Sequence, residues 1–394
     1  NYLSRMSELP RKHEQYLLGL KIRESRDIIP PRFVIEKVLE QMRDFMATAP
    51  EENILYTSLA TKLEEAEKID EAQAEEILDK VAVSIEQNVY PAYGQFVNYF
   101  TELEAKAGTD DGLWRLPEGE AAYKLALRMF TTTSYTPDEI HELGLAEVDR
   151  IQAEMMEIFA AEGVDISQGY TEAMDAYSSR PEFYYEDSDE GRQQILDDYQ
   201  TILDELDAGL DAAFNIRPKA GMEVKRIPEF REKTAPGAYY QQPSLDGTRP
   251  GRFYANLYDI KATPKFGMRT LAVHEGVPGH HFQVAIGMEL EGMPLFRRFS
   301  LFTAYVEGWA LYAERVAWEL GLMPTNADNI GRLTAELFRA VRLVVDTGIH
   351  HRRWTREEAI EYMLANTVMA ESDVVSEIER YIVWPGQATA YKVG

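Results

Sequence analysis

The hydrophobic and polar positions of residues 1 to 107 alternate with a helical period. In the segment "PPRFVIEKVLEQMRDFM", residues 30 to 46, apolar side chains recur every three to four positions, which is the spacing of one helix face. Pro30 and Pro31 suit the first turn of such a helix, because a proline there leaves no backbone N–H unpaired. A turn-rich break, "GTDDGLWRLPEGE", follows at residues 108 to 120.

Two longer helices are expected beyond this break. Thr136 is followed by "PDE", and a threonine cap, a proline and two acidic residues are the signals of a helix start. This pattern predicts a helix over residues 138 to 161. A second periodic segment predicts a helix over residues 189 to 213.

The pattern changes near residue 220. The segment "VKRIPEFREKTAPGAYYQQPSLDGTRPGRFYANLYDI" is rich in proline, glycine and aromatic residues. Within it, only "GRFYANLYDI", residues 251 to 260, alternates well enough to predict a strand. Helical patterns then return and predict helices over about 266–290, 297–320, 327–349, 355–367 and 371–382.

These elements predict a mainly α protein, a large bundle-like helical body with a small β-sheet just before residue 266. We expect an N-terminal helical region over residues 1–219 and a second region, which carries the candidate chemistry, over residues 220–394. Both regions are expected to form one continuous body. The 394 residues, 45% of them hydrophobic, can bury a sizeable core.

Composition and charge limit the partners and the chemistry. The chain has no cysteine, so disulfides and thiolate zinc sites are excluded and any metal must be held by His, Asp or Glu. A net charge of −26 repels nucleic acid, and no apolar run is long enough to predict a membrane-spanning helix. The chain begins at Asn1 without a signal peptide, and both ends look cut. A longer native protein is therefore expected, and compartment and oligomeric state stay open.

The candidate chemistry lies in "LAVHEGVPGHHFQ", residues 271 to 283. His274 and Glu275 open like a helical zinc motif, but the second histidine of that motif belongs at position 278, which is proline. On an unbroken α-helix, His280 would lie about 240° around and about 9 Å along from His274. His281 would lie on nearly the same face, but about 10.5 Å away along the axis.

Pro278 makes an unbroken helix energetically unfavourable. It has no N–H, and its ring clashes with the carbonyl group of His274. A helical proline costs about 3 kcal/mol, and the flanking Gly276 and Gly279 cost about 1 kcal/mol each. Two interpretations follow: a loop between two helices with incidental histidines, or a local bulge that brings His280 back beside His274.

A second segment, "FTAYVEGWALYAERVAWELG", predicts a helix that is buried on most sides and contains Glu307. A buried carboxylate needs a partner, because an unpaired one is expensive. Two histidines and one carboxylate are the ligand set of a catalytic zinc, and helical zinc hydrolases commonly take the third ligand from a downstream helix. The alternative is that Glu307 is an ordinary surface or N-terminal helix acid.

Several segments together make the sequence resemble a known family: "HEGVPGHHFQ", "EGWALYAE", "VDTGIHHRRWTREEAIEYM", "RYIVWPGQATAYKVG", "TTTSYTPDEIHELGLAEVDRI" and "PSLDGTRPGRFYANL". The chain resembles the DUF885 family of bacterial proteins, which is grouped with the gluzincin metallopeptidases. This resemblance implies a mostly helical, peptidase-like fold, one Zn²⁺ per chain and a peptide substrate.

The resemblance also implies roles for residues of the two motifs. His274 and Glu307 would be metal ligands, and Glu275 would be the general base that activates water. The second histidine ligand would be His280, because "PGH" parallels the Gly-His end of related motifs, with His281 as the alternative.

Other residues are candidates for contacts with substrate. His350, after "DTGI", and Tyr391 are candidate donors to an oxyanion. The alternative for His350 is a helix C-cap cation. Arg380 or Lys392 would hold a substrate carboxylate, which would make the protein a carboxypeptidase, or would form structural pairs.

The segment "FYANL", residues 253 to 257, is expected to be an edge strand that binds extended peptide. Tyr254 and Asn256 would then contact the substrate. The preferred prediction is a zinc-dependent metallopeptidase that cleaves short peptides. The alternatives are a zinc amidase or esterase with another substrate, and a noncatalytic protein with a vestigial or structural cluster.

Overall fold

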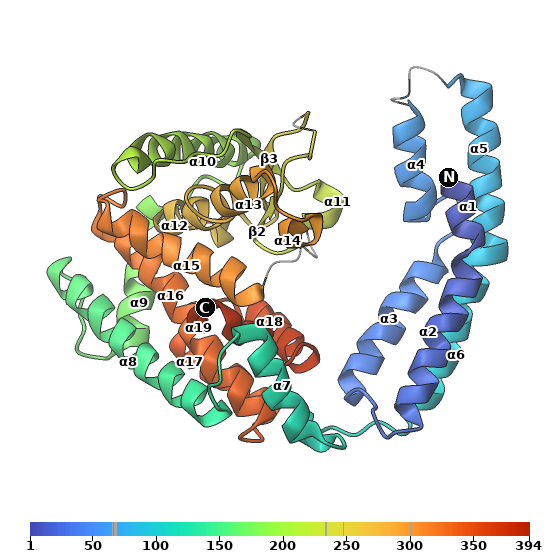
Figure 1. Ribbon diagram of the computed structural model, residues 1–394, viewed down its shortest axis with the longest axis horizontal. Helices are drawn as coiled ribbons and strands as arrows, with labels where there is room; N and C mark the ends of the chain where they lie inside the picture. Colours follow the sequence, from blue (N-terminus) through green and yellow to red (C-terminus); the bar gives the residue numbers. More distant parts are fainter. Residues whose placement is uncertain (65, 67–68, 233–234, 247, 300–301) are drawn as a thin grey trace. The chain divides into compact units, whose positions relative to one another are not determined.

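The computed structural model confirms a mainly α protein with a small β-sheet (Figure 1). It describes residues 1–64, 66, 69–232, 235–246, 248–299 and 302–394. The chain forms two compact units, Asn1–Gly119 and Glu120–Gly394. The division therefore falls at the turn-rich break, and the expected boundary at 219/220 lies inside the second unit. Over the described residues, no helix combines the length and apolar character needed to cross a membrane.

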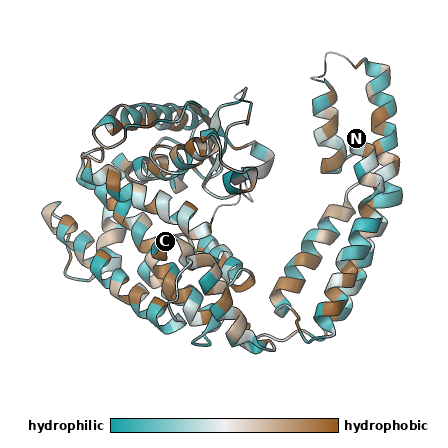
Figure 2. Ribbon diagram, viewed as in Figure 1, coloured by the Kyte–Doolittle hydropathy of each residue, from teal (hydrophilic) through white to brown (hydrophobic). Residues whose placement is uncertain are grey.

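The first unit is built from helices that pack around two small cores. One core joins α2, α3 and α6 through residues such as Leu17, Leu39 and Phe100. The other joins α1, α4 and α5 through residues such as Met6 and Val81. Figure 2 shows hydrophobic and hydrophilic residues alternating along these helices, as the periodicity predicted. The helices are α1 (Tyr2–Ser7), α2 (Leu9–Glu24), α3 (Arg32–Ala47), α4 (Ile54–Glu64), α5 (Glu71–Ser84) and α6 (Tyr90–Glu104), with a π-helical turn at Ile85–Val89 and a 3-10 turn at Leu113–Arg115.

Two 25-residue helices, α8 (Pro137–Ala161) and α16 (Asn326–His350), pack along each other in the second unit. Their backbones approach closely at Gly144, where an added Cβ would lie 2.8 Å from the Cβ of Leu343. Thr136 caps α8 through a reciprocal pair of hydrogen bonds with Glu139, as its sequence predicted. The other helices of this unit are α7 (Gly119–Thr131), α9 (Tyr170–Ser178), α10 (Asp189–Gly209), α11 (Glu229–Glu232), α12 (Lys265–Glu275), α13 (His280–Glu289), α14 (Leu295–Phe299), α15 (Thr303–Glu319), α17 (Arg356–Asn366), α18 (Glu371–Val383) and α19 (Ala390–Val393).

The sheet has three short strands, β1 (Met222–Arg226), β2 (Ala238–Gln241) and β3 (Gly251–Ala255), in the order β1-β3-β2. β3 pairs in parallel with β1 and antiparallel with β2. The expected strand at 251–260 is thus confirmed in its first half. Its expected place at an edge is wrong, because both sides of β3 are already hydrogen-bonded. A peptide therefore cannot extend the sheet along β3.

The sequence pattern located the C-terminal helices but not their interruptions. The expected helix 266–290 is two helices, α12 and α13, separated by Gly276–Gly279. Of the expected helix 297–320, residues 303–319 form α15, and residues 300–301 lie outside the described residues. The expected helix 189–213 is α10 followed by a 3-10 turn at Leu210–Ala212.

One core holds α10, β3, α12, α13 and α15 together. Tyr199 packs edge-on against Phe253 at 4.8 Å between ring centroids. Val273, Phe282 and Ala313 are buried in the same core. This packing fixes the three helices α12, α13 and α15 against one another, with α16 also in contact with α12 and α15.

Candidate metal centre

The link between α12 and α13 turns the chain back on itself. A Cβ on Gly279 would overlap the backbone carbonyl oxygens of Val273 and His274, so only glycine allows this close approach. Trp309 of α15 donates its indole N–H to the carbonyl oxygen of Pro278 at 2.8 Å. The Val277–Pro278 peptide bond is cis. The link is thus a loop between two helices, the first of the two interpretations that the sequence left open. It nevertheless brings His280 beside His274, with 4.9 Å between the ring centroids.

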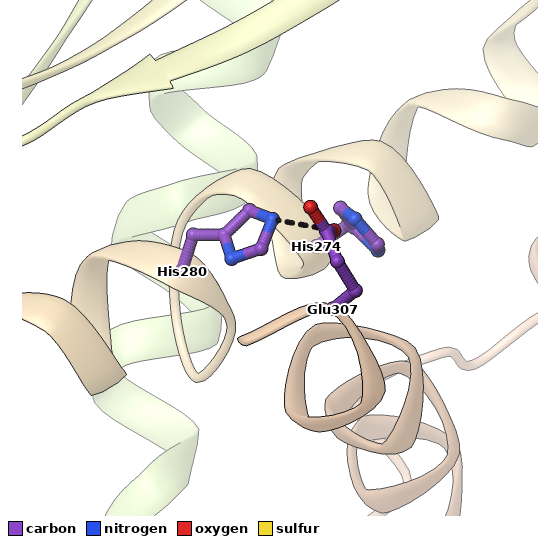
Figure 3. Close-up of side chains that lie close together, drawn as sticks. All are labelled: His274, His280 and Glu307. Carbon is purple, nitrogen blue, oxygen red and sulfur yellow. Dashed lines mark ion pairs between the residues drawn. The ribbon is translucent and has the colours of Figure 1, made fainter. Parts of the chain in front are cut away.

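Three side chains converge where this link ends (Figure 3). His274 comes from α12, His280 is the first residue of α13, and Glu307 comes from the first half of α15. One donor atom from each lies within 4.8 Å of the other two. His280 Nε2 and Glu307 Oε2 are 3.5 Å apart, close to the ~3.4 Å between two ligands of a tetrahedral zinc with bonds of about 2.1 Å.

The cluster is closed at its base and open on one side. His274 is buried, whereas 12% of the His280 side chain and 21% of the Glu307 side chain remain exposed. Three converging ligand residues with a solvent-facing side are the arrangement that leaves a fourth position for water or substrate.

Glu314, which the sequence analysis missed, orients His274. Its Oε1 lies 2.7 Å from His274 Nδ1, and the carboxyl is only 1% exposed. An Nδ1–H donated to this carboxyl group leaves Nε2 of His274 free to bind a metal, as in many carboxylate–histidine–zinc sites. The signal was present in "EGWALYAE", because a residue seven positions after Glu307 returns to the same helix face after two turns.

His281 belongs to the sheet side of α13 and not to the cluster. Its Nδ1 is 3.0 Å from the hydroxyl of Tyr240, and its Nε2 is 3.0 Å from the carbonyl oxygen of Ala220. Both ring nitrogens therefore have partners. Of the two histidines between which the sequence could not decide, the structure brings His280 to the cluster.

The charges of the cluster shift one another's pKa values. Burial raises the pKa of Glu275, the last residue of α12, and the charge of Glu307 raises it further, while that of His280 lowers it. Burial lowers the pKa of His274 well below its usual range, so this ring is neutral near pH 7. Burial raises the pKa of Glu314 to about 8. The charges of His280 and Glu307 thus both act on the carboxyl group of Glu275.

His280 and Glu307 stabilise each other's charged forms. Burial lowers the pKa of His280, but the hydrogen bond to Glu307 and the charge of Glu275 outweigh it, and the net shift is upward. Burial raises the pKa of Glu307, but the interactions with His280 and the charge of Arg339 bring the net shift downward.

Comparison with known proteins places the chain in a family. The sequence profile of a family described as "Bacterial protein of unknown function (DUF885)" matches residues 1–394. The chain belongs to the DUF885 family. A search of curated proteins gave no match for this DUF885 chain.

Two solved structures share the DUF885 chain's fold. The first is a crystal structure from Colwellia psychrerythraea, described as a "putative lipoprotein". It is 38% identical with a TM-score of 0.96, and the match covers 99% of this chain and 67% of that one. The second is from Shewanella oneidensis, a "putative lipoprotein of unknown function". It is 16% identical with a TM-score of 0.70, and the match covers 100% of this chain and 69% of that one, so it supports the fold alone.

Other residues expected to contact substrate have structural partners. His350 is 1% exposed, and its Nε2 lies 3.0 Å from the carbonyl oxygen of Tyr381. Arg380 forms an ion pair with Glu377 and a hydrogen bond with the side chain of Gln387. Lys392 forms ion pairs with two acidic residues, Glu147 and Glu336.

The two residues at the sheet that were expected to contact substrate, Tyr254 and Asn256, also have partners within the protein. Tyr254 stacks on Tyr239 at 4.9 Å between centroids. The amide of Asn256 donates to the backbone carbonyl groups of Glu232, Ala235 and Pro236. Tyr391 borders a pocket of about 340 Å³ that Gly308 and Glu314 of α15 also line.

Proposed function

We propose that this chain is a zinc-dependent hydrolase whose substrates are short peptides, in line with the resemblance of its motifs to gluzincin metallopeptidases. The observation that carries the proposal is the convergence of His274, His280 and Glu307 from three different elements, with their donor atoms within 4.8 Å. Two histidines and a carboxylate with one open side are the ligand set of catalytic zinc.

The residues present fit a zinc ion. The low pKa of His274 keeps its ring neutral, which a metal ligand requires, and its Nδ1 is engaged with Glu314, so Nε2 is the donor. His280 would bind through the nitrogen that faces Glu307. When bound, zinc lowers the pKa of a water molecule towards 7 and polarises the carbonyl group of the substrate.

Glu275 would move the protons of the reaction. It follows His274 directly in the chain, and its raised pKa suits a base that takes a proton near neutral pH. In peptide hydrolysis it would accept a proton from water as the oxygen attacks the carbonyl carbon. It would then donate that proton to the nitrogen of the amine as the C–N bond breaks.

The same residues would hydrolyse other amides or esters, so the choice of peptides rests on the family resemblance. A noncatalytic role is supported by a different observation: His280 and Glu307 already form an ion pair, which can stabilise the loop without a metal. The catalytic role predicts hydrolysis by the wild type that depends on Glu275, whereas the noncatalytic role predicts no hydrolysis by the wild type or by a Glu275 variant.

The test is peptide hydrolysis by the zinc-loaded chain and by Glu275→Gln. Glu319→Gln is the matched control, because Glu319 lies at the exposed end of α15 and pairs with Arg315. We expect Glu275→Gln to keep its zinc and to lose about 10²- to 10⁴-fold in rate, with the control unaffected. Full activity of Glu275→Gln would exclude it as the base, and the absence of hydrolysis by the zinc-loaded wild type would overturn the proposed function.

A further inference from the structure

Two arginines project from α16 beside the metal cluster. Arg339 and Arg342 are three residues apart, so they share a face of the helix, and α16 packs against both α12 and α15. Both guanidinium groups lie over the ring of Phe338, at 5.5 and 4.1 Å from its centroid. Both also lie near the ring of Tyr391, at 6.0 and 4.6 Å.

Only some of the nitrogen atoms of Arg342 have hydrogen-bond partners. It is 6% exposed, donates from Nε to the hydroxyl of Tyr381 at 2.7 Å, and pairs through Nη2 with Glu377 at 3.0 Å. Its Nη1 is buried without a hydrogen-bond partner in the described part of the chain. The charge of Glu377 is moreover shared, because this carboxylate also pairs with Arg380 at 2.9 Å.

Arg339 has fewer partners still. Among the described residues it forms no ion pair, and its one hydrogen bond runs from Nη1 to the carbonyl oxygen of Ala335 at 3.3 Å. Its Nε is buried and has no hydrogen-bond partner in the part of the chain that the structure describes. In a chain of net charge −26, a buried guanidinium edge without an acidic partner is unusual, because desolvated donors are normally paired.

The positive charges of Arg339 and Arg342 both act on residues of the metal cluster. The charge of Arg339 lowers the pKa values of His274, Glu275 and Glu307. The charge of Arg342 lowers those of His274 and Glu307. The geometry agrees: the ring of Tyr391, near which both guanidinium groups lie, borders the same pocket as Gly308 and Glu314 of α15.

We propose that Arg339 and Arg342 form a subsite for the C-terminal carboxylate of a peptide. The unpaired Nε of Arg339 and Nη1 of Arg342 supply donors, and the planar guanidinium group matches a carboxylate with two parallel hydrogen bonds. This inference rests on the proposed function, and it makes the enzyme a carboxypeptidase. It assigns the role to a different pair than Arg380 and Lys392, which have acidic partners and, among the described residues, no buried nitrogen without a hydrogen-bond partner.

The test compares peptides that differ only at the C-terminus, as the free acid or the amide. Arg339→Gln removes the charge, and Arg339→Lys keeps it without the planar fork. Arg352→Gln is the control, because it removes a cation just beyond α16 whose partners are the surface acids Asp138 and Glu142. Arg339 is preferred to Arg342 because its replacement leaves no acidic partner unpaired.

We expect wild type to prefer the free acid, and Arg339→Gln to lower the acid-to-amide ratio of kcat/KM by about 30-fold or more. Arg339→Lys should lower it less, and Arg352→Gln should leave it unchanged. A general loss of stability would lower both rates and leave the ratio unchanged. An unchanged ratio in Arg339→Gln, with peptides still cleaved, would overturn the subsite and leave the proposed function intact.

A binding measurement separates the two proposals. Calorimetry of zinc-free protein with N-acetylalanine and N-acetylalaninamide needs no hydrolysis. Binding of the acid alone, lost in Arg339→Gln, supports the subsite even if no peptide is cleaved. Equal or absent binding of both probes would overturn it. Preference for an amidated peptide with an internal acidic side chain would contradict the C-terminal assignment.

Discussion

Replacing Glu314 tests how the cluster is held in place. Glu314 is 1% exposed and lies 2.7 Å from His274 Nδ1, so its carboxyl group fixes the ring that offers Nε2 to the metal. In Glu314→Gln the amide oxygen still accepts the hydrogen bond. Zinc affinity is compared above pH 8, where the carboxyl group of Glu314 is ionised, because there the variant replaces a charged bond with a neutral one that is about half as strong. In Glu314→Leu the acceptor is gone and the Nδ1–H is left unpaired.

The magnitude follows from these contacts. Loss of a group that supports a metal ligand typically costs 10- to 100-fold in affinity. We expect zinc affinity to fall about 10-fold in Glu314→Gln and about 100-fold in Glu314→Leu, or about 1.4 and 2.8 kcal/mol. The assay is competition for zinc with a chromophoric chelator, with Glu319→Gln on the same helix as control. Wild-type affinity in Glu314→Leu would refute this account of His274.

Three further predictions concern the link, the second histidine and the core. Gly279→Ala should abolish zinc binding in a protein of near-native helix content by circular dichroism, because the added Cβ overlaps two carbonyl oxygens. His280→Gln should lose zinc and His281→Gln should keep it, measured as metal content; the reverse result would exchange their roles. Burial raises the pKa of Asp346 to about 7, so its ionisation should lower wild-type stability by about 4 kcal/mol as the pH rises from about 4 to 7. Urea unfolding should show that Asp346→Asn loses about 4 kcal/mol less than the wild type over this range, and equal losses in the two proteins would contradict this assignment.

Local sequence signals were sufficient to predict most of the helices. Thr136 and the residues after it specify the start of α8 without help from the rest of the chain, because a capping box acts within one turn. The strands β1 and β2 were not predicted because, unlike β3, they do not alternate between buried and more exposed positions. Their stability comes from pairing with β3, which lies later in the chain.

The candidate site was predictable as a set of residues but not as a geometry. Pro278 showed that the helix is interrupted, yet the path of the link depends on Trp309, 31 residues later. The tertiary partners of His281, Tyr240 and Ala220, decide between the two histidines. Arg339 and Arg342 resemble ordinary helix cations in sequence, and only their missing partners in the folded chain distinguish them.

The central claim is that His274, His280 and Glu307 hold one zinc ion. The most direct measurement is the metal content, by mass spectrometry, of protein purified without chelator or metal-affinity resin, for the wild type and for Glu307→Ala. We predict about one zinc per chain in the wild type and its loss in the variant. No zinc in the wild type after zinc is added and the excess removed, or equal zinc in both proteins, would contradict the account.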